Sequence, residues 1–157
     1  MEFFDSHAHY NDEKFKIDQE EIIKKIYEEN ITKVVVAGYN VKSSKEAVEL
    51  AQKYDFIYAI CGISPNDIGD NFEDEIKQIE ELCKNNKKIV AIGEIGLDYY
   101  WNKDNKAIQK QCFISQIELA NKLNLPIVIH SRDAFIDTID VLKRVPVNKK
   151  GIFHCCQ

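Results

Sequence analysis

Six short apolar runs rich in β-branched residues alternate with helical patterns, and this alternation constrains the fold more than any other feature of the sequence. The runs are Phe3–Asp5, Lys33–Ala37, Phe56–Cys61, Ile89–Gly93, Pro126–Ile129 and Gly151–Phe153. Most of them are continuously apolar rather than alternating in polarity, which is typical of strands buried on both faces of a parallel sheet. The predicted class is therefore α/β with a parallel sheet.

Five stretches with helical periodicity lie between these runs. Their apolar residues recur at the spacing that places them on one face of a helix, and they span residues 22–27, 47–54, 72–83, 108–123 and 135–142. The longest stretch, Asn105–Asn124, should end before Pro126, because proline disfavours helical geometry in the residue that precedes it. We predict that all five helices turn their apolar faces towards the core.

Two α/β architectures are compatible with this order of elements, an open doubly wound sheet and a closed (β/α)8 TIM barrel. The open sheet lacks support because no Gly-x-Gly-x-x-Gly motif follows the first strand. We therefore predict a single domain over residues 1–157 of the (β/α)8 TIM-barrel type. A complete barrel usually takes about 250 residues, so we expect an incomplete barrel with about six strands and five helices.

Composition limits the functional classes. Lys and Arg total 21 against 26 Asp and Glu, and the resulting formal charge of −5 argues against broad electrostatic binding to nucleic acid. Such a charge still permits an enzyme that holds phosphates through bound metal ions. The sequence contains no apolar run of membrane-spanning length and no secretory signal pattern. Its five cysteines lack Cys-x-x-Cys spacing and indicate reduced thiols, so we expect a cytoplasmic protein with no membrane partner.

All four histidines lie where a predicted strand ends. His7 and His9 follow the first strand, His130 the fifth and His154 the sixth, and Glu94 follows the fourth. In a barrel the carboxyl ends of all strands open on one face, where catalytic residues gather. Imidazole and carboxylate together suit divalent transition metals. The sequence therefore predicts a metal site made by these five side chains.

Five ligands exceed what a single zinc ion with an open catalytic position normally uses. A carboxylate can bridge two ions because each of its oxygens can bind one, and Glu94 is the predicted bridge. Two ions roughly 3.5–4 Å apart can stabilise the attacking and leaving oxygens of an in-line phosphoryl displacement. Cys155 and Cys156 follow His154 directly, so either one supplies a thiolate ligand or neither has a chemical role.

Four segments carry these residues in recognisable contexts. They are Asp5–His9 (DSHAH), Ala91–Tyr99 (AIGEIGLDY), Pro126–Ala134 (PIVIHSRDA) and Gly151–Cys155 (GIFHC). As a set they resemble the TatD family of metal-dependent deoxyribonucleases, within the amidohydrolase-like barrels. The resemblance implies a hydrolase that cleaves phosphodiester bonds in DNA from a strand end, with water activated by two divalent metal ions.

The same resemblance implies a role for each of the five ligands. His7 and His9 bind one ion, His130 and His154 bind the other, and Glu94 bridges the two as a catalytic residue. The identity of the two ions is undecided from the sequence, and zinc, manganese and magnesium are the candidates.

Three further features near these motifs have two interpretations each. Arg132 either meets a substrate phosphate as a catalytic, bidentate donor or forms a surface ion pair with Asp133 or Asp137. Asp98 either orients a metal ligand or is a solvated loop carboxylate. The aromatic run Tyr99–Trp101 either stacks on exposed bases or packs under a loop.

The sequence departs from the family at two places. Ser64 and Asn66 stand beside Pro65 where family members commonly carry histidines, which leaves the metal ligands intact and puts substrate contact at this loop in doubt. Gln157 comes before the last two strands, and before the late aspartate that the family supplies as a metal ligand near the attacking water. We therefore expect an N-terminal portion of a longer enzyme or a naturally shortened copy, which self-associates through exposed barrel edges.

Three functions stay open from the sequence. The first is metal-dependent hydrolysis of DNA, with the activity of the short chain undecided. The second is amide or ester hydrolysis on the same barrel, which often uses a carbamylated lysine as the bridge where this chain has Glu94. The third is a catalytically incomplete metal-binding or interaction protein. Metal content does not separate the first from the third, whereas turnover on DNA does.

Overall fold

Six parallel strands form one sheet, and their order in space is their order in the sequence. The computed structural model describes residues 1–154. The strands are β1 (Phe3–Ala8), β2 (Ile31–Ala37), β3 (Ile57–Cys61), β4 (Ile89–Asp98), β5 (Ile127–Arg132) and β6 (Ile152–His154). Every neighbouring pair is parallel, as their continuous apolar sequences predict.

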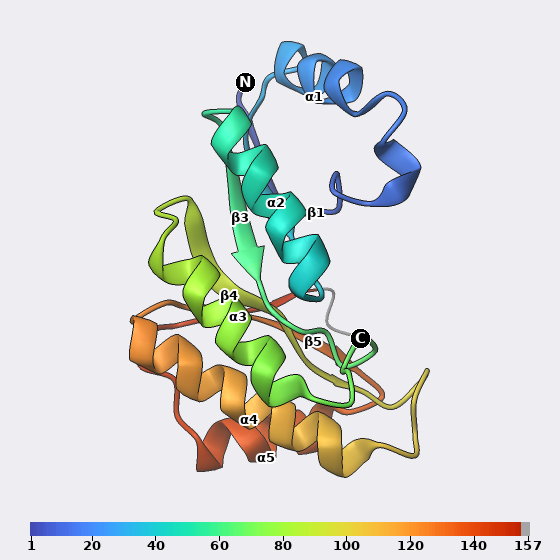
Figure 1. Cartoon of the computed structure of the whole chain (residues 1–157), viewed down its shortest axis with the longest axis vertical. Coiled ribbons are helices and arrows are strands. Elements are labelled where there is room, and N and C mark those ends of the chain that lie inside the picture. Colours follow the sequence, from blue (N-terminus) through green and yellow to red (C-terminus); the bar gives the residue numbers. More distant parts are fainter. Residues whose placement is uncertain (155–157) are drawn as a thin grey trace.

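One α-helix connects each strand to the next, which is the crossover that parallel strands require. The helices are α1 (Gln19–Glu28), α2 (Val41–Lys53), α3 (Phe72–Lys84), α4 (Lys106–Leu123) and α5 (Phe135–Arg144), with a short 3-10 turn at Glu13–Phe15 before α1. Helix α3 contacts both α2 and α4, so these three helices lie side by side on one side of the sheet (Figure 1). The predicted α/β fold of barrel type, with six strands and five helices, is confirmed for the part of the chain that the structure describes.

The inner strands β2 to β5 are buried on both faces, whereas β1 and β6, at the two ends of the sheet, contain no buried residue. In β2, Val34 and Val36 belong to the large cluster that includes helix residues, whereas Val35 and Ala37 belong to a second cluster on the opposite face. That second cluster is built from strand residues alone: Val35, Ala37, Ile60, Ala91 and Val128. Because successive side chains of a strand alternate between faces, burial of both faces explains why the strand sequences are continuously apolar.

The sheet curves until its first and last strands approach each other at their carboxyl ends. The imidazole ring of His7 in β1 stacks on that of His154 in β6, with 3.6 Å between ring centroids and 9° between ring planes. These two strands lie at opposite ends of the strand order. Their contact therefore requires the sheet to curl around its inner cluster, as the strands of a barrel do.

Strand β4 extends beyond its predicted end at Gly93 and continues to Asp98, so Glu94 lies inside the strand. Its register with β5 shifts between Ile92 and Ile95, an irregularity of the kind that re-aims side chains beside functional sites. Gly96 has a φ of +142°, and a Cβ atom there would lie 2.0 Å from the carbonyl oxygen of His130. Glycine is therefore required for β4 to approach β5 this closely.

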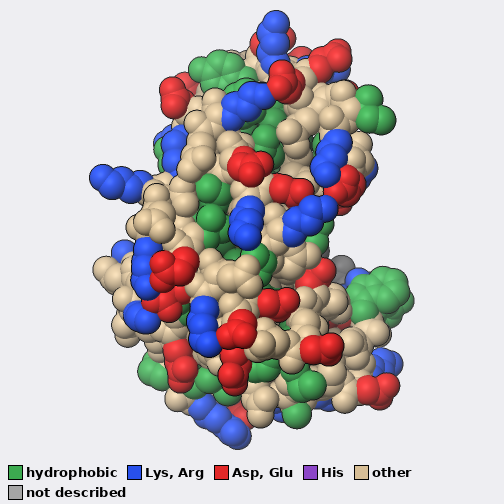
Figure 2. Space-filling view, in the orientation of Figure 1, with side chains coloured by type: hydrophobic (Ala, Val, Ile, Leu, Met, Phe, Trp, Pro, Cys, Tyr) green, Lys and Arg blue, Asp and Glu red, His purple; other side chains and the backbone are tan. Residues whose placement is uncertain are grey.

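Charges of both signs are mixed on the face of the molecule that carries α2, α3 and α4 (Figure 2). Within residues 1–154, every helix is too short or too polar to cross a membrane.

Candidate metal centre

The five predicted ligands meet at the carboxyl ends of four strands. His7 lies in β1 and His9 just after it, Glu94 lies in β4, His130 in β5 and His154 at the end of β6. His130 and His154 are direct partners in the β5–β6 register. Parallel pairing therefore brings together side chains that are far apart in the sequence, as the positions of the histidines predict.

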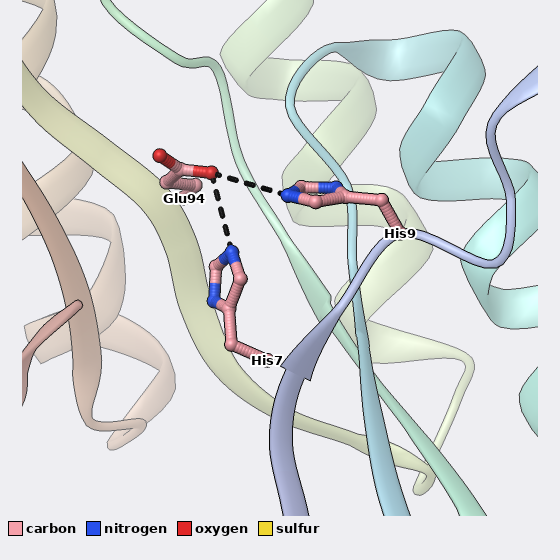
Figure 3. Close-up of side chains that lie close together, drawn as sticks. All are labelled: His7, His9 and Glu94. Carbon is pink, nitrogen blue, oxygen red and sulfur yellow. Dashed lines mark ion pairs between the residues drawn. The ribbon is translucent and has the colours of Figure 1, made fainter. Parts of the chain in front are cut away.

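The first group consists of His7, His9 and Glu94, whose side chains point towards one another (Figure 3). The Nε2 atom of His7 lies 3.4 Å from Oε2 of Glu94, and Nε2 of His9 lies 3.9 Å from the same oxygen. One potential ligand atom from each residue lies within 4.8 Å of the others. The group has the composition and spacing of a site for one divalent ion.

The second group consists of Glu94, His130 and His154, and its potential ligand atoms also lie within 4.8 Å of one another. The Nδ1 atom of His130 lies 2.8 Å from Oε1 of Glu94. The two oxygens of Glu94 thus face different histidines, with Oε2 towards His7 and His9 and Oε1 towards His130. This is the orientation that a carboxylate shared by two ions needs.

His7 provides an independent test of whether a metal fits here. Its side chain is 8% exposed, and neither ring nitrogen makes a hydrogen bond within residues 1–154. A buried polar atom without a partner costs free energy, so such atoms in native proteins usually have an unseen partner. A divalent ion facing the Nε2 atom of His7 would supply that partner, and the residues present therefore fit a metal.

The surroundings of Glu94, His9 and His154 shift the pKa of each of these side chains. Burial opposes ionisation of Glu94, but the nearby imidazoles of His130 and His7 hold the pKa of its carboxyl far below the usual range. Burial, reinforced by repulsion from His7, lowers the pKa of His9 and of His154. An ionised carboxylate and neutral imidazoles are the protonation states that metal ligation requires.

Asp98 fixes His130 from the side opposite Glu94. Its buried carboxylate lies 2.9 Å from Nε2 of His130 and accepts hydrogen bonds from the backbone N–H groups of Tyr100 (2.9 Å) and Trp101 (3.0 Å). It also accepts a hydrogen bond from the side-chain amide of Asn66, at 3.0 Å. Asp98 is therefore not a solvated loop carboxylate, and its contacts are those of a residue that orients a ligand.

Sequence reasoning missed the role of Asn66. The sequence marked this position only as one where the family commonly has histidine. In the structure, the side-chain amide of Asn66 donates a hydrogen bond to Asp98, and the backbone N–H of Asn66 donates one to Ser64 Oγ at 3.3 Å. The available signal was the location of the Ser64-Pro65-Asn66 motif just beyond the end of β3, after Gly62 and Ile63. Strand ends at this edge of the sheet carry the other site residues.

Arg132 ends β5, and its guanidinium lies against aromatic rings rather than carboxylates. The guanidinium carbon is 4.0 Å from the ring centroid of Tyr100 and 5.5 Å from that of Trp101. The predicted alternative, a surface ion pair with Asp133 or Asp137, is not found among residues 1–154.

The aromatic run Tyr99–Trp101 divides into one buried and two exposed residues. Tyr99 is only 7% exposed and packs under the loop, as one of the two interpretations predicts. Its hydroxyl donates a hydrogen bond to Asp137, at 2.7 Å, and Asp137 also pairs with Lys110, at 2.8 Å. Tyr100 and Trp101, in contrast, are 49% and 68% exposed.

The cysteines add nothing to the centre within the described residues. Cys61, Cys83 and Cys112 are free thiols, as predicted. The predicted choice between a thiolate ligand and a bystander at Cys155 and Cys156 lies outside the described residues.

Comparison with known proteins agrees with this geometry. The sequence profile of the TatD related DNase family matches residues 4–157. An uncharacterized metal-dependent hydrolase of Bacillus subtilis, YabD, is 44% identical over 97% of the chain, and one of Mycoplasma genitalium is 37% identical over 99%. The crystal structure of the TatD homolog YjjV from Escherichia coli superposes on 99% of the chain with a TM-score of 0.91, at 26% sequence identity.

In each of these three comparisons the chain spans 60% of the length of the protein that it matches. The family profile nevertheless covers almost the whole of this sequence, from residue 4 to residue 157. The chain belongs to the TatD-related DNase family.

Proposed function

We propose that this chain carries the metal centre of a hydrolase that cleaves phosphodiester bonds in DNA at strand ends. The observation that carries the proposal is the position of Glu94, whose two oxygens face two separate sets of histidines. Membership of the TatD-related DNase family supports DNA as the substrate. Amide or ester hydrolysis has less support, because the position between the two histidine sets holds Glu94.

In the proposed enzyme, His7 and His9 would hold one divalent ion and His130 and His154 the other, with Glu94 touching both. Bound divalent ions polarise a phosphoryl oxygen and lower the pKa of water, which provides the nucleophile at neutral pH. The chain's own contribution is to fix the ligands before substrate arrives. His130 is held between Glu94 and Asp98, and the register shift in β4 directs Glu94 into the centre.

Arg132 is proposed to bind a phosphate of the DNA strand. The guanidinium carbon lies 4.0 Å from the ring centroid of Tyr100, and an aromatic ring leaves the N–H groups of an arginine available as donors to a phosphate. A planar fork of donors suits a phosphate group, which accepts two parallel hydrogen bonds. In this arrangement Arg132 orients the strand and adds positive charge beside the metal centre.

The test is release of nucleotides from single-stranded and duplex DNA by the purified protein, with magnesium, manganese or zinc supplied in parallel. Glu94→Gln and His7→Ala should both lose turnover, whereas Glu49→Gln, on the exposed surface of α2, should retain it. Turnover retained in Glu94→Gln would reveal a contaminating nuclease or a different centre. Metal binding without turnover would favour a metal-binding protein over an enzyme.

A further inference from the structure

Two exposed aromatic rings project from the end of β4, next to the candidate metal centre. Tyr100 and Trp101 are 49% and 68% exposed, and their ring centroids are 4.9 Å apart with the planes at 90°. Tyr99, in the same short run, is buried. Packing of the loop therefore accounts for Tyr99 but leaves the exposure of its two neighbours unexplained.

Arg132 completes this surface. Its guanidinium lies over the ring of Tyr100 and near that of Trp101, within the range of cation–π attraction. No carboxylate lies within ion-pair distance of it among residues 1–154. Because acidic residues outnumber basic ones in this chain, a cation without an acidic partner beside two exposed rings favours an anionic ligand with an aromatic part.

Asp98 connects this surface to the metal centre. One oxygen of its carboxylate accepts the backbone N–H groups of both Tyr100 and Trp101, and the other lies 2.9 Å from Nε2 of His130. A single buried side chain thus fixes the backbone of the aromatic pair and a candidate metal ligand. The backbone that carries the two rings is consequently fixed relative to the centre.

We propose that Tyr100, Trp101 and Arg132 form a subsite for an unpaired nucleobase and its neighbouring phosphate in a single DNA strand. This inference rests on the proposed function, since it takes DNA as the ligand. Stacking of bases on aromatic rings is tolerant of sequence, because every base presents a π-face. A paired base inside a duplex is already stacked and does not offer that face, so the subsite selects single-stranded or frayed ends.

Trp101 is the single tryptophan of the chain, so its fluorescence reports on the subsite directly. The experiment titrates the full chain with oligodeoxythymidylate in excess EDTA, which prevents metal-dependent hydrolysis. We expect saturable quenching of Trp101. An oligomer of the same length built from abasic deoxyribose phosphates keeps the phosphates and lacks the bases, so it should bind weakly and leave the fluorescence unchanged.

Variants locate the binding energy by anisotropy of a labelled oligonucleotide. Trp101→Ala and Tyr100→Ala should each weaken binding about tenfold, the effect of losing one stacking partner. Tyr27→Ala on α1 removes another tyrosine that is 53% exposed and serves as the matched control, which should bind normally. Circular dichroism and thermal unfolding would verify that each variant is folded.

The proposal is overturned if the abasic oligomer quenches Trp101 as well as the thymidylate does, or if both aromatic variants bind DNA like the parent. These results are independent of turnover because no metal is present. Hydrolysis of DNA without stacking would remove the subsite and leave the proposed function intact. Stacking without hydrolysis under any metal would uphold the subsite and contradict the proposed function.

Discussion

The two sides of Glu94 are organised differently. On the side of β5, His130 is held between two carboxylates, with Nδ1 at 2.8 Å from Glu94 and Nε2 at 2.9 Å from Asp98. On the side of β1, neither ring nitrogen of His7 makes a hydrogen bond among residues 1–154, and the ring of His9 has only a 3.3 Å contact between its Nδ1 atom and the carbonyl oxygen of Ala37. Contacts within the protein thus fix the ring of His130, whereas the ring nitrogens of His7 have no such partner among these residues.

Replacing the residue common to both sides should have the largest effect. Glu94→Gln removes the only charge shared by the two groups, so we expect both to lose metal and hydrolysis to fall by about 10³-fold or more. Metal content by elemental analysis and single-turnover hydrolysis would measure this. Two equivalents of metal bound by the Glu94→Gln protein would show that the two groups do not share Glu94.

Removing one histidine from each side should separate the two groups. His7→Ala should lose one equivalent of metal and keep the ion held by His130 and His154, while His154→Ala should do the reverse. Hydrolysis should fall by roughly 10²-fold or more in each variant if both ions stabilise the transition state. Calorimetric titration with zinc gives the stoichiometry. Loss of both equivalents in either variant would mean that the sides are interdependent and that the comparison between them fails.

Asp98→Asn should weaken one side selectively. The amide keeps the shape of Asp98 but loses the charge that holds Nε2 of His130, and loss of such a partner typically costs 10–100-fold in metal affinity. The metal affinity of the group formed by His7, His9 and Glu94 should change little. Competition with a chromophoric chelator, carried out in the His7→Ala and His154→Ala backgrounds, measures each side separately.

Two controls sharpen the Asp98 prediction. Asn66→Ala removes one donor to Asp98 and leaves its charge, so its effect on metal affinity should be in the same direction and smaller. Asp140→Asn changes a carboxylate on α5 that pairs at the surface with Arg144, and metal affinity should not change. Equal loss of affinity on both sides in Asp98→Asn would indicate general damage to the fold.

The fold and the meeting of the five candidate ligands were predictable because their signals are local. Burial of both faces of the inner strands is indicated by their continuous apolar runs, and a histidine at a strand end needs only parallel pairing to meet its partners. The extension of β4 was not predictable, since Glu94–Asp98 contains a glycine and two carboxylates and resembles a loop. It becomes a strand only through pairing with β5, where Gly96 lies opposite His130 and Asp98 opposite Arg132.

Contacts between distant segments account for the other differences. An ion pair of Arg132 with Asp133 or Asp137 was one of its two predicted roles, because these residues are close in the sequence. In the folded chain, Asp137 instead accepts a hydrogen bond from Tyr99 and forms an ion pair with Lys110. The bond between Asn66 and Asp98 joins residues 32 positions apart. Neither pairing has a periodic or motif signal in the sequence, so both required the coordinates.

The smallest effect that we predict concerns the protonation of the histidines without metal. Burial lowers the pKa of His9 and His154, with repulsion from His7 adding to it. Burial acts on His130 in the same direction, but hydrogen bonds to Glu94 and Asp98 outweigh it and raise its pKa above the ordinary 6.5. In chelator, the Hε1 resonance of His130 should titrate at higher pH than those of His9 and His154.

These opposite shifts stabilise the fold in opposite pH ranges. The contribution of His130 is fully present below pH 6.5 and is lost as the pH rises through its higher folded-state pKa. His9 and His154 favour the neutral form in the fold, so their contribution is present above pH 6.5 and is lost as the pH falls through their lower folded-state values. Asp98→Asn should bring the titration of His130 towards lower pH and leave that of His9 nearly unchanged. A shift of both resonances together would mean that Asp98 acts on the whole centre, and the two sides of Glu94 would then have to be treated as one unit.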